Sequence, residues 1–380
     1  MRRSNYKLII IALLFTSPIF AWNSPTENSG DKEYELNYSE TFDINNDALI
    51  QFDTKHGNVR IKEGNGNKAI FDIHISTDAN DQEEADAIFD AIKIHFDDSR
   101  SSIFVETDID FDGRKNKSWW ENIFGGWNNS VSFQIDMDVT LPNTVELEID
   151  HAFGDVYIPD MNNDVEIEIK HGRGRFSNIN GDADVSIKHG KVSMGDVHNL
   201  VVECHHSDYS MGIGKEIEVD ISHSDFEIDG ADMMELDARH SDFTIGNVGK
   251  IITDSGHTDF EIERVDFANF ETSFGDIEID WLGNQGLFDV EHSSIDIDEV
   301  SNQADGIEVE GAHSNVSLDV EHSFSLDFEG SHVRPNIRHD MDFSEKDDEG
   351  NTYRYIGKHG ANPKLKIEID LQHGSFRLND

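Results

Sequence analysis

A histidine recurs at a constant interval in this 380-residue chain, at positions 206, 223, 240 and 257. Each copy continues with Ser or Thr, then Asp, then Tyr or Phe. A fixed period of this kind is typical of a solenoid, in which equivalent residues of successive coils lie on neighbouring strands about 4.8 Å apart. The repeat therefore predicts an all-β protein, a single right-handed β-solenoid or β-helix, whose histidines form a column.

Apolar residues occupy fixed positions around the repeated histidine, six, four and two residues before it and three and five residues after it. In one coil these are Ile217, Val219 and Ile221 before His223, then Phe226 and Ile228. A mostly apolar position eight residues after the histidine closes a short third side. The spacing of the repeat widens toward the C-terminus, and Phe274 replaces the histidine in one coil. Distant copies of the repeat occur at His56 and His373. The pattern predicts a structural ladder of His171, His189, His206, His223, His240, His257, His292 and His313.

The alternation of a β-strand predicts where these histidines point. Counting by twos from the preceding apolar residues places the imidazoles on the inner face, and the Gly or Ser that follows supplies a corner. We expect the stacked rings to satisfy one another inside the corner. Because like charges at this spacing repel strongly in a poorly solvated interior, we expect the fold to lose stability in acid.

The repeated aspartates form a second column one corner position away, nearer the solvent: Asp208, Asp225, Asp242, Asp259 and Asp276. One interpretation is a corner cap repeated by symmetry, in which each carboxylate accepts a turn amide. The other is a divalent-cation site, with calcium at the aspartates or zinc, copper or nickel at the histidines. Inward imidazoles would need an access path for a metal. Otherwise the sequence implies no cofactor.

Residues 1–21 have the features of a signal peptide. Arg2, Arg3 and Lys7 precede an apolar run from Leu8 to Phe15, and Ala21 ends a cleavage site. Residues 22–33 follow as a flexible linker. We expect an exported protein, periplasmic or extracellular at the cell surface.

Residues 34–150 are predicted to form an N-terminal β-rich region before the regular coils. Asp81 and Glu84 have capping-box spacing at the start of a short helix over residues 81–92. A loop over residues 112–130 combines cations with the aromatic residues Trp119, Trp120, Phe124 and Trp127. This loop has two interpretations, a peripheral membrane or sugar contact, or a segment that folds back over the open end of the solenoid.

The remaining chain divides into regular coils at 151–333 and a closing region at 334–380. The closing region contains an acidic loop from Glu345 to Glu349, the pair Tyr353 and Tyr355, and the last coil. The single cysteine, Cys204, excludes an internal disulfide and occupies an inward position, which favours a buried thiol.

The chain is strongly acidic, with 30 Lys and Arg against 78 Asp and Glu and a net charge of −48. Nucleic acid is excluded as a partner because phosphate contacts need clustered cations. The charge favours cations as partners, or serves as a solvated face that prevents aggregation.

Three segments carry a family resemblance: Phe133 to Pro142, Val145 to Ile149 and Gly154 to Ile158. They resemble the bacterial adhesin-like family of β-strand-repeat proteins, the toast-rack type. Similar units recur at His56 to Val59, His189 to Val192, Phe274 to Ile277 and His373 to Phe376. The resemblance implies an extracytoplasmic β-solenoid without established catalytic residues. The chain departs from the family at the ladder, where histidine replaces the usual Asn or Ser.

These observations predict a non-catalytic, exported, adhesin-like β-solenoid that binds or scaffolds a cell-envelope component, a glycan or a protein. The first alternative is a divalent-cation-binding envelope protein that uses the aspartate or histidine column. The second is a polysaccharide-active β-helix enzyme, although the sequence contains no phosphate-binding loop, zinc-protease motif or nucleophile elbow.

Overall fold

The computed structural model describes residues 32–109 and 132–379, which divide into two compact units at Asn163 and Asp164. Apart from one helix, the regular elements of these residues are β-strands, and equivalent strands pair in parallel from coil to coil. The predicted all-β solenoid is confirmed. The expected signal peptide and the loop over 112–130 lie outside the described residues. Within these residues, no helix has the length and hydrophobicity needed to cross a bilayer.

The first unit contains short coils bordered by antiparallel strands. β2 pairs in parallel with β6 and β8, while β3 pairs in parallel with β7 and β9. The antiparallel neighbours are β4 beside β7, β1 beside β4, and β5 beside β6. The strands are β1 (Lys32–Asp43), β2 (Leu49–Lys55), β3 (Val59–Glu63), β4 (Lys68–Ala79), β5 (Ile92–Asp98), β6 (Ser102–Ile109), β7 (Phe133–Leu141), β8 (Glu146–Ala152) and β9 (Val156–Ile158).

Helix α1 (Gln82–Ala91) lies within the predicted range. The Asp81 carboxylate accepts the Glu84 N–H at 2.9 Å, which satisfies one of the free amides of the first turn. Glu84 in turn accepts the N–H of Asn80, one residue earlier than a standard capping box. The apolar face of the helix buries Ala85 and Ile88.

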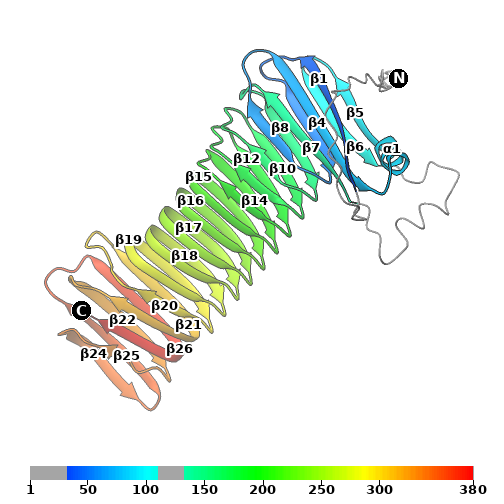
Figure 1. Ribbon diagram of the computed structural model, residues 1–380. Helices are drawn as coiled ribbons and strands as arrows, with labels where there is room; N and C mark the ends of the chain where they lie inside the picture. The colour runs from blue at the N-terminus through cyan, green and yellow to red at the C-terminus, as the bar shows by residue number, and fades with distance from the viewer. Residues whose placement is uncertain (1–31, 110–131, 380) are drawn as a thin grey trace, which may run out of the picture. The chain divides into compact units, whose positions relative to one another are not determined.

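The second unit is a stack of parallel coils in steady register. Asp208 pairs with Asp225, which pairs with Asp242, and the same step continues to Asp259. Figure 1 shows β15 to β18 side by side in this stack. The strands are β10 (Val165–Lys170), β11 (Arg173–Phe176), β12 (Ala183–Lys188), β13 (Lys191–Met194), β14 (Asn199–His205), β15 (Asp208–Ser222), β16 (Asp225–Arg239), β17 (Asp242–Gly256), β18 (Asp259–Ser273) and β19 (Asp276–Glu291).

The core of the coils consists of the predicted apolar positions. Tyr209 and Phe226 stack at 5.3 Å between centroids, and Phe243 and Phe260 stack at 5.1 Å. The third-side residues are also buried, namely Ile179, Val197, Val248, Val265, Leu282 and Val300. Burying one large apolar side chain contributes about 1.5–3 kcal/mol, so the repeated core is the main stabilising feature of the fold.

The closing region departs from sequence order. β26 pairs in parallel with both β21 and β22, so the last coil of the sequence lies between two earlier strands. The segment Glu345 to Glu349, expected as a loop, is strand in a hairpin of β24 with β25, because β22 pairs with β25 and supports it. These strands are β20 (Ser294–Ile297), β21 (Gly306–Asp319), β22 (Phe324–Ser331), β23 (Asn336–Ile337), β24 (Asp342–Glu349), β25 (Thr352–His359) and β26 (Leu365–Asn379).

Candidate functional site

One corner of the second unit is built from residues in the left-handed backbone conformation. Their φ angles lie between 51° and 60°, and their side chains are exposed. We name this set the histidine column: His171, His189, His206, His223, His240, His257, Phe274, His292, His313, His332 and His373. The expectation that the imidazoles point inward is therefore wrong.

The physical reason lies in the spacing around each corner. Cys204 and Tyr209 are both buried although they are five residues apart, which strict alternation does not permit. The left-handed residue His206 interrupts the alternation and turns outward, and Ser207 takes the inward position at 4% exposure. Histidine is among the residues enriched in this conformation, so the odd interval and the residue type together could have located the turn.

The rings of the histidine column stack on one another. Centroids of neighbouring rings lie 4.4–5.3 Å apart, and the interplanar angles are 1–16° except for 34° between His240 and His257. Phe274 stacks between His257 and His292, at 4.8 and 4.9 Å. It continues the stack but offers no nitrogen. The column thus presents ring edges, with their nitrogens, to the solvent.

A column of buried hydroxyls lies beneath the rings, and the sequence interpretation missed its role. The Ser224 hydroxyl donates to the Ser222 carbonyl at 2.9 Å and accepts the Ser207 N–H at 2.9 Å. Ser207 and Ser241 repeat the donation within their own coils. The hydroxyls therefore satisfy corner groups that would otherwise be buried and unpaired. The Ser or Thr after each repeated histidine was the available signal.

The aspartate column lies on the strand after the corner, and all five of its side chains are exposed. Burial raises the pKa of Asp242, and the neighbouring charges of Asp225 and Asp259 raise it further. The Asp259 carboxylate accepts the Asp276 N–H at 2.8 Å, which is the geometry of a corner cap. Within residues 32–109 and 132–379, no group of three or more His, Cys, Asp or Glu converges on a common point.

His151 is a buried histidine of the first unit, at 1% exposure. It occupies an inward position two residues before the left-handed Phe153. Its Nε2 lies 2.8 Å from the Gly57 carbonyl and must donate there, so Nδ1 accepts the Thr54 hydroxyl, also at 2.8 Å. Burial lowers the pKa of His151, because the charged ring would lose its hydration. This ring behaves as the whole column was expected to behave.

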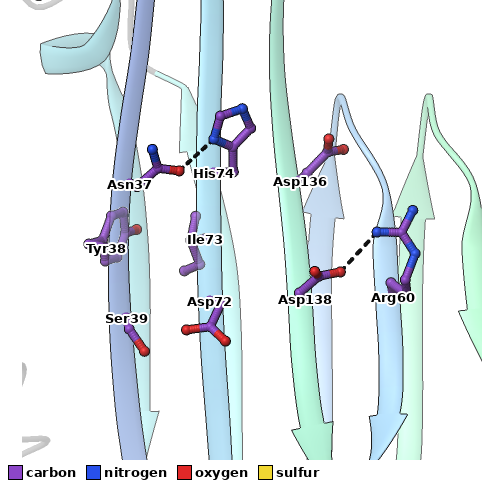
Figure 2. Close-up of a pocket in the computed structure, with 9 residues that line it drawn as sticks. All are labelled: Asn37, Tyr38, Ser39, Arg60, Asp72, Ile73, His74, Asp136 and Asp138. Carbon is purple, nitrogen blue, oxygen red and sulfur yellow. Dashed lines mark hydrogen bonds and ion pairs between the residues drawn. The ribbon is translucent and has the colours of Figure 1, made fainter. Parts of the chain in front are cut away.

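The outer face of the first unit carries a groove of about 550 Å³. Side chains of adjacent strands line it, most of them polar, together with Tyr38 and Ile73. Figure 2 shows the Asn37 amide oxygen facing the His74 imidazole. None of its lining residues was singled out from the sequence, since isolated polar residues on exposed strand faces carry no distinctive pattern. The polar lining comprises Asn37, Ser39, Arg60, Asp72, His74, Asp136 and Asp138.

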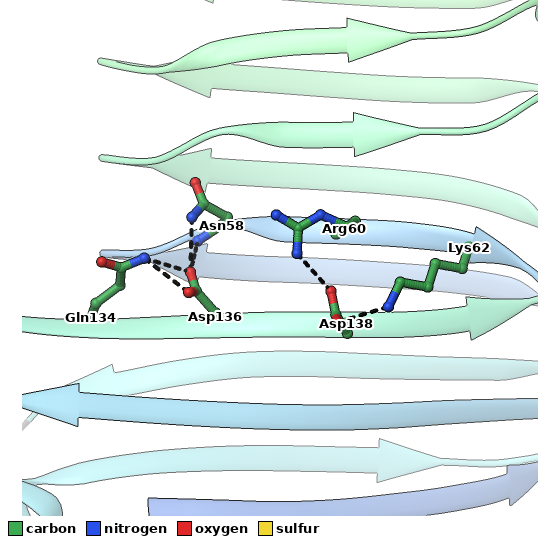
Figure 3. Close-up of polar contacts among 6 residues, drawn as sticks. All are labelled: Asn58, Arg60, Lys62, Gln134, Asp136 and Asp138. Carbon is green, nitrogen blue, oxygen red and sulfur yellow. Dashed lines mark hydrogen bonds and ion pairs between the residues drawn. The ribbon is translucent and has the colours of Figure 1, made fainter. Parts of the chain in front are cut away.

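Two carboxylates of the groove are held by their own sheet (Figure 3). Asp138 accepts from Arg60 at 2.9 Å and from Lys62 at 2.8 Å. Burial raises the pKa of Asp138, but these two hydrogen bonds outweigh it and keep the pKa below its usual range. Asp136 accepts from the Asn58 N–H at 2.8 Å and from Gln134 at 2.9 Å. A general acid needs a raised pKa, so Asp138 does not suit that role.

The structure was also compared with the predictions for Cys204 and for the aromatic loop. Cys204 is fully buried, as predicted, and burial raises the pKa of its thiol to about 11. Trp119, Trp120, Phe124 and Trp127 lie outside the described residues, and their binding role stays a prediction.

Comparison with known proteins adds structural likenesses of low identity. No family model and no curated protein matches the chain. A candidate lipid-binding protein from Parabacteroides distasonis matches at TM-score 0.37 and 8% identity, over 64% of this chain and 96% of its own. A candidate cell adhesion protein from Clostridium sporogenes matches at TM-score 0.18 and 11% identity, over 91% of this chain and 99% of its own. A candidate adhesin from Bacteroides fragilis matches at TM-score 0.23 and 10% identity, over 90% of this chain and 97% of its own.

At these values the likenesses identify no ligand or partner, so a function for this chain has to be inferred from its own residues.

Proposed function

We propose that this protein is a non-catalytic, exported, adhesin-like β-solenoid that binds or scaffolds a cell-envelope component through its exposed repeat surface. The exposed histidine column carries this proposal. A left-handed non-glycine residue costs about 1–2 kcal/mol, and Gly or Asn would occupy these corners more easily. Ring stacking offsets part of that cost, at about 0.5–1.5 kcal/mol per pair, but does not require nitrogens at the surface. A contact role accounts for them.

The repetition also favours a partner with repeated features. Identical groups on successive coils can engage a polymer or an ordered surface at several points, and linked weak contacts add up to strong binding. A signal peptide over residues 1–21 and the resemblance to extracytoplasmic solenoids support export. The aspartate column beside the rings disfavours polyanionic partners.

Binding of the full chain to purified peptidoglycan sacculi and to phospholipid vesicles tests the proposal. We expect sedimentation with an envelope material that weakens in a variant with His206→Asn, His223→Asn and His240→Asn. A matched Asp225→Asn and Asp242→Asn variant should sediment like the parent. EDTA in all buffers removes any contribution from metal ions. No sedimentation with either material, or equal binding by the histidine variant, would overturn the proposal.

The predicted Trp-rich loop has its own variant. Trp119→Ala, Trp120→Ala and Trp127→Ala together should reduce binding to vesicles or sacculi if the loop contacts the envelope. Unchanged binding with a lower melting temperature would indicate a loop that covers the fold. Export is tested by fractionating a bacterial host and by a mature N-terminus at Trp22 in mass spectrometry.

A further inference from the structure

We propose that the histidine column binds divalent transition-metal ions such as zinc and nickel, with each ion held by imidazole nitrogens of two neighbouring coils. The sequence pattern weighed against histidine ligands because inward rings would need an access path. The structure places the rings outside, so this objection no longer applies. Metal binding at the column does not depend on the proposed envelope binding.

The ring nitrogens are available to a ligand. Among the described residues, the imidazoles of His206, His223 and His240 form no hydrogen bond with another residue. A neutral imidazole has one nitrogen with a free lone pair, and imidazole is a ligand that suits zinc, copper and nickel. Each of these rings can therefore donate a lone pair without breaking a hydrogen bond.

The spacing sets what kind of site forms. Rings of His206 and His223 lie 4.9 Å apart and almost parallel, so their lone pairs do not converge as they stand. Two nitrogens that share a tetrahedral zinc ion lie roughly 3.4 Å apart, given zinc to nitrogen distances of about 2.0–2.1 Å. Both rings must therefore tilt toward each other. Solvent-exposed side chains permit such rotation.

The resulting sites should be open and exchangeable. No third protein ligand converges at the column within the described residues. Water, or a group from a partner, would fill the other coordination positions. Binding of this kind is expected to be weaker than at a closed structural zinc site.

Carboxylates on both sides of the column favour cations. The aspartate column follows it by two positions, as in Asp225 after His223. A second acidic column, three positions before the rings, contains Glu203, Asp220, Asp237, Asp254 and Glu271, all exposed. The chain as a whole carries a net charge of −48. This field concentrates divalent cations near the rings, and salt should weaken the effect.

Phe274 divides the column into two runs. The first contains the histidines from His171 to His257 in stacking order, and the second contains His292, His313, His373 and His332. Because Phe274 offers no nitrogen, an ion cannot be shared across it. Substituting histidines in one run should therefore reduce the metal bound by that run and leave the metal bound by the other run unchanged.

Two experiments test the inference. The first is calorimetric titration of the chelator-treated full chain with zinc chloride, and the second is retention of the untagged chain on immobilised nickel. We expect zinc binding by the parent and less zinc per chain in the variant with His206→Asn, His223→Asn and His240→Asn. Asp225→Asn and Asp242→Asn together should weaken the affinity slightly but leave the zinc bound per chain unchanged. Absence of zinc binding and nickel retention would overturn the inference. The inference would also be overturned if the histidine variant bound as much zinc per chain as the parent, or if the aspartate variant bound less zinc per chain.

A gain-of-ligand variant covers the case in which the histidine variant fails to fold. In a His240→Asn variant, His257 has no neighbouring imidazole, because Phe274 lies on its other side. Phe274→His in that variant gives His257 a partner and should increase the zinc bound per chain, whereas Phe274→Tyr should not. Equal zinc capacity of the two Phe274 variants would contradict shared binding by neighbouring rings. Because envelope binding is measured in EDTA, failure of one proposal is distinguishable from failure of the other.

Discussion

The backbone N–H of Ser207 donates to the hydroxyl of Ser224 in the next coil at 2.9 Å. That hydroxyl also donates to the carbonyl of Ser222 at 2.9 Å, and both Ser207 and Ser224 are buried. One side chain thereby joins the corners of two coils. This inward hydroxyl explains how the preceding residue, His223, can leave the core without leaving buried polar groups unpaired.

Replacing Ser224 by Ala should destabilise the coils. The substitution leaves the Ser207 N–H without its partner in a buried corner, at a cost of about 1–3 kcal/mol. Urea denaturation followed by circular dichroism measures the change. The exposed Ser193→Ala serves as the control and should unfold like the parent. Equal midpoints for the two variants would show that the buried hydroxyl contributes nothing.

Substitutions at His223 test whether this residue is an outward, left-handed corner residue or an inward strand residue. His223→Val should destabilise the protein by about 1–3 kcal/mol, because a β-branched residue is strained at positive φ. His223→Asn should cost less, since Asn adopts this conformation readily. Thermal melts of both variants give the comparison. If valine matched or exceeded asparagine, the corner geometry would be wrong.

The first unit should lose stability in acid through His151. Burial lowers the pKa of the folded state below the unfolded value of about 6.5, so the unfolded state binds more protons below that pH. The stabilisation is present above about pH 6.5 and is lost as pH falls toward the folded pKa, by at most about 1.4 kcal/mol per pH unit.

His151→Gln removes this titration. Its unfolding free energy should depend less steeply on pH than that of the parent, measured by denaturation between neutral and mildly acidic pH. Burial also lowers the pKa of His56, so the His151→Gln variant should still show a smaller dependence of the unfolding free energy on pH. Identical slopes for His151→Gln and the parent would argue against the burial effect.

Asp242→Asn should raise the melting temperature slightly at neutral pH. Burial and the charges of Asp225 and Asp259 raise the pKa of Asp242, so its ionised form is disfavoured in the fold. Other coils carry Ser294 or Asn315 at this position without a charge. The gain should shrink at about 1 M salt, where the Debye length is about 3 Å. A melting temperature that falls would instead indicate that the carboxylate serves as a cap.

The repeat made most of the fold predictable. The constant period predicted the register of Asp208 with Asp225, and the apolar positions predicted the buried faces. The position of β26 between β21 and β22 was not predictable, because the last coil pairs with strands far away in sequence. Short-range pattern does not encode such a rearrangement.

The candidate site was found by sequence but placed on the wrong side. The recurrence of His206 and His223 identified the column. The inward placement of the rings rested on a strict alternation of side chains, which holds only along an unbroken strand. One left-handed residue reverses that assignment for every coil. The groove around Asp138 and Arg60 was not predictable, because its residues come from strands separated in sequence and follow no repeat.

Histidine footprinting with diethyl pyrocarbonate near neutral pH, read by mass spectrometry of peptides, tests the central claim that the column faces solvent. Exposed imidazoles should react quickly at His206, His223 and His240, whereas buried His151 should react only when the first unit unfolds. Protection of the three column histidines to the same extent as His151 would contradict the outward column.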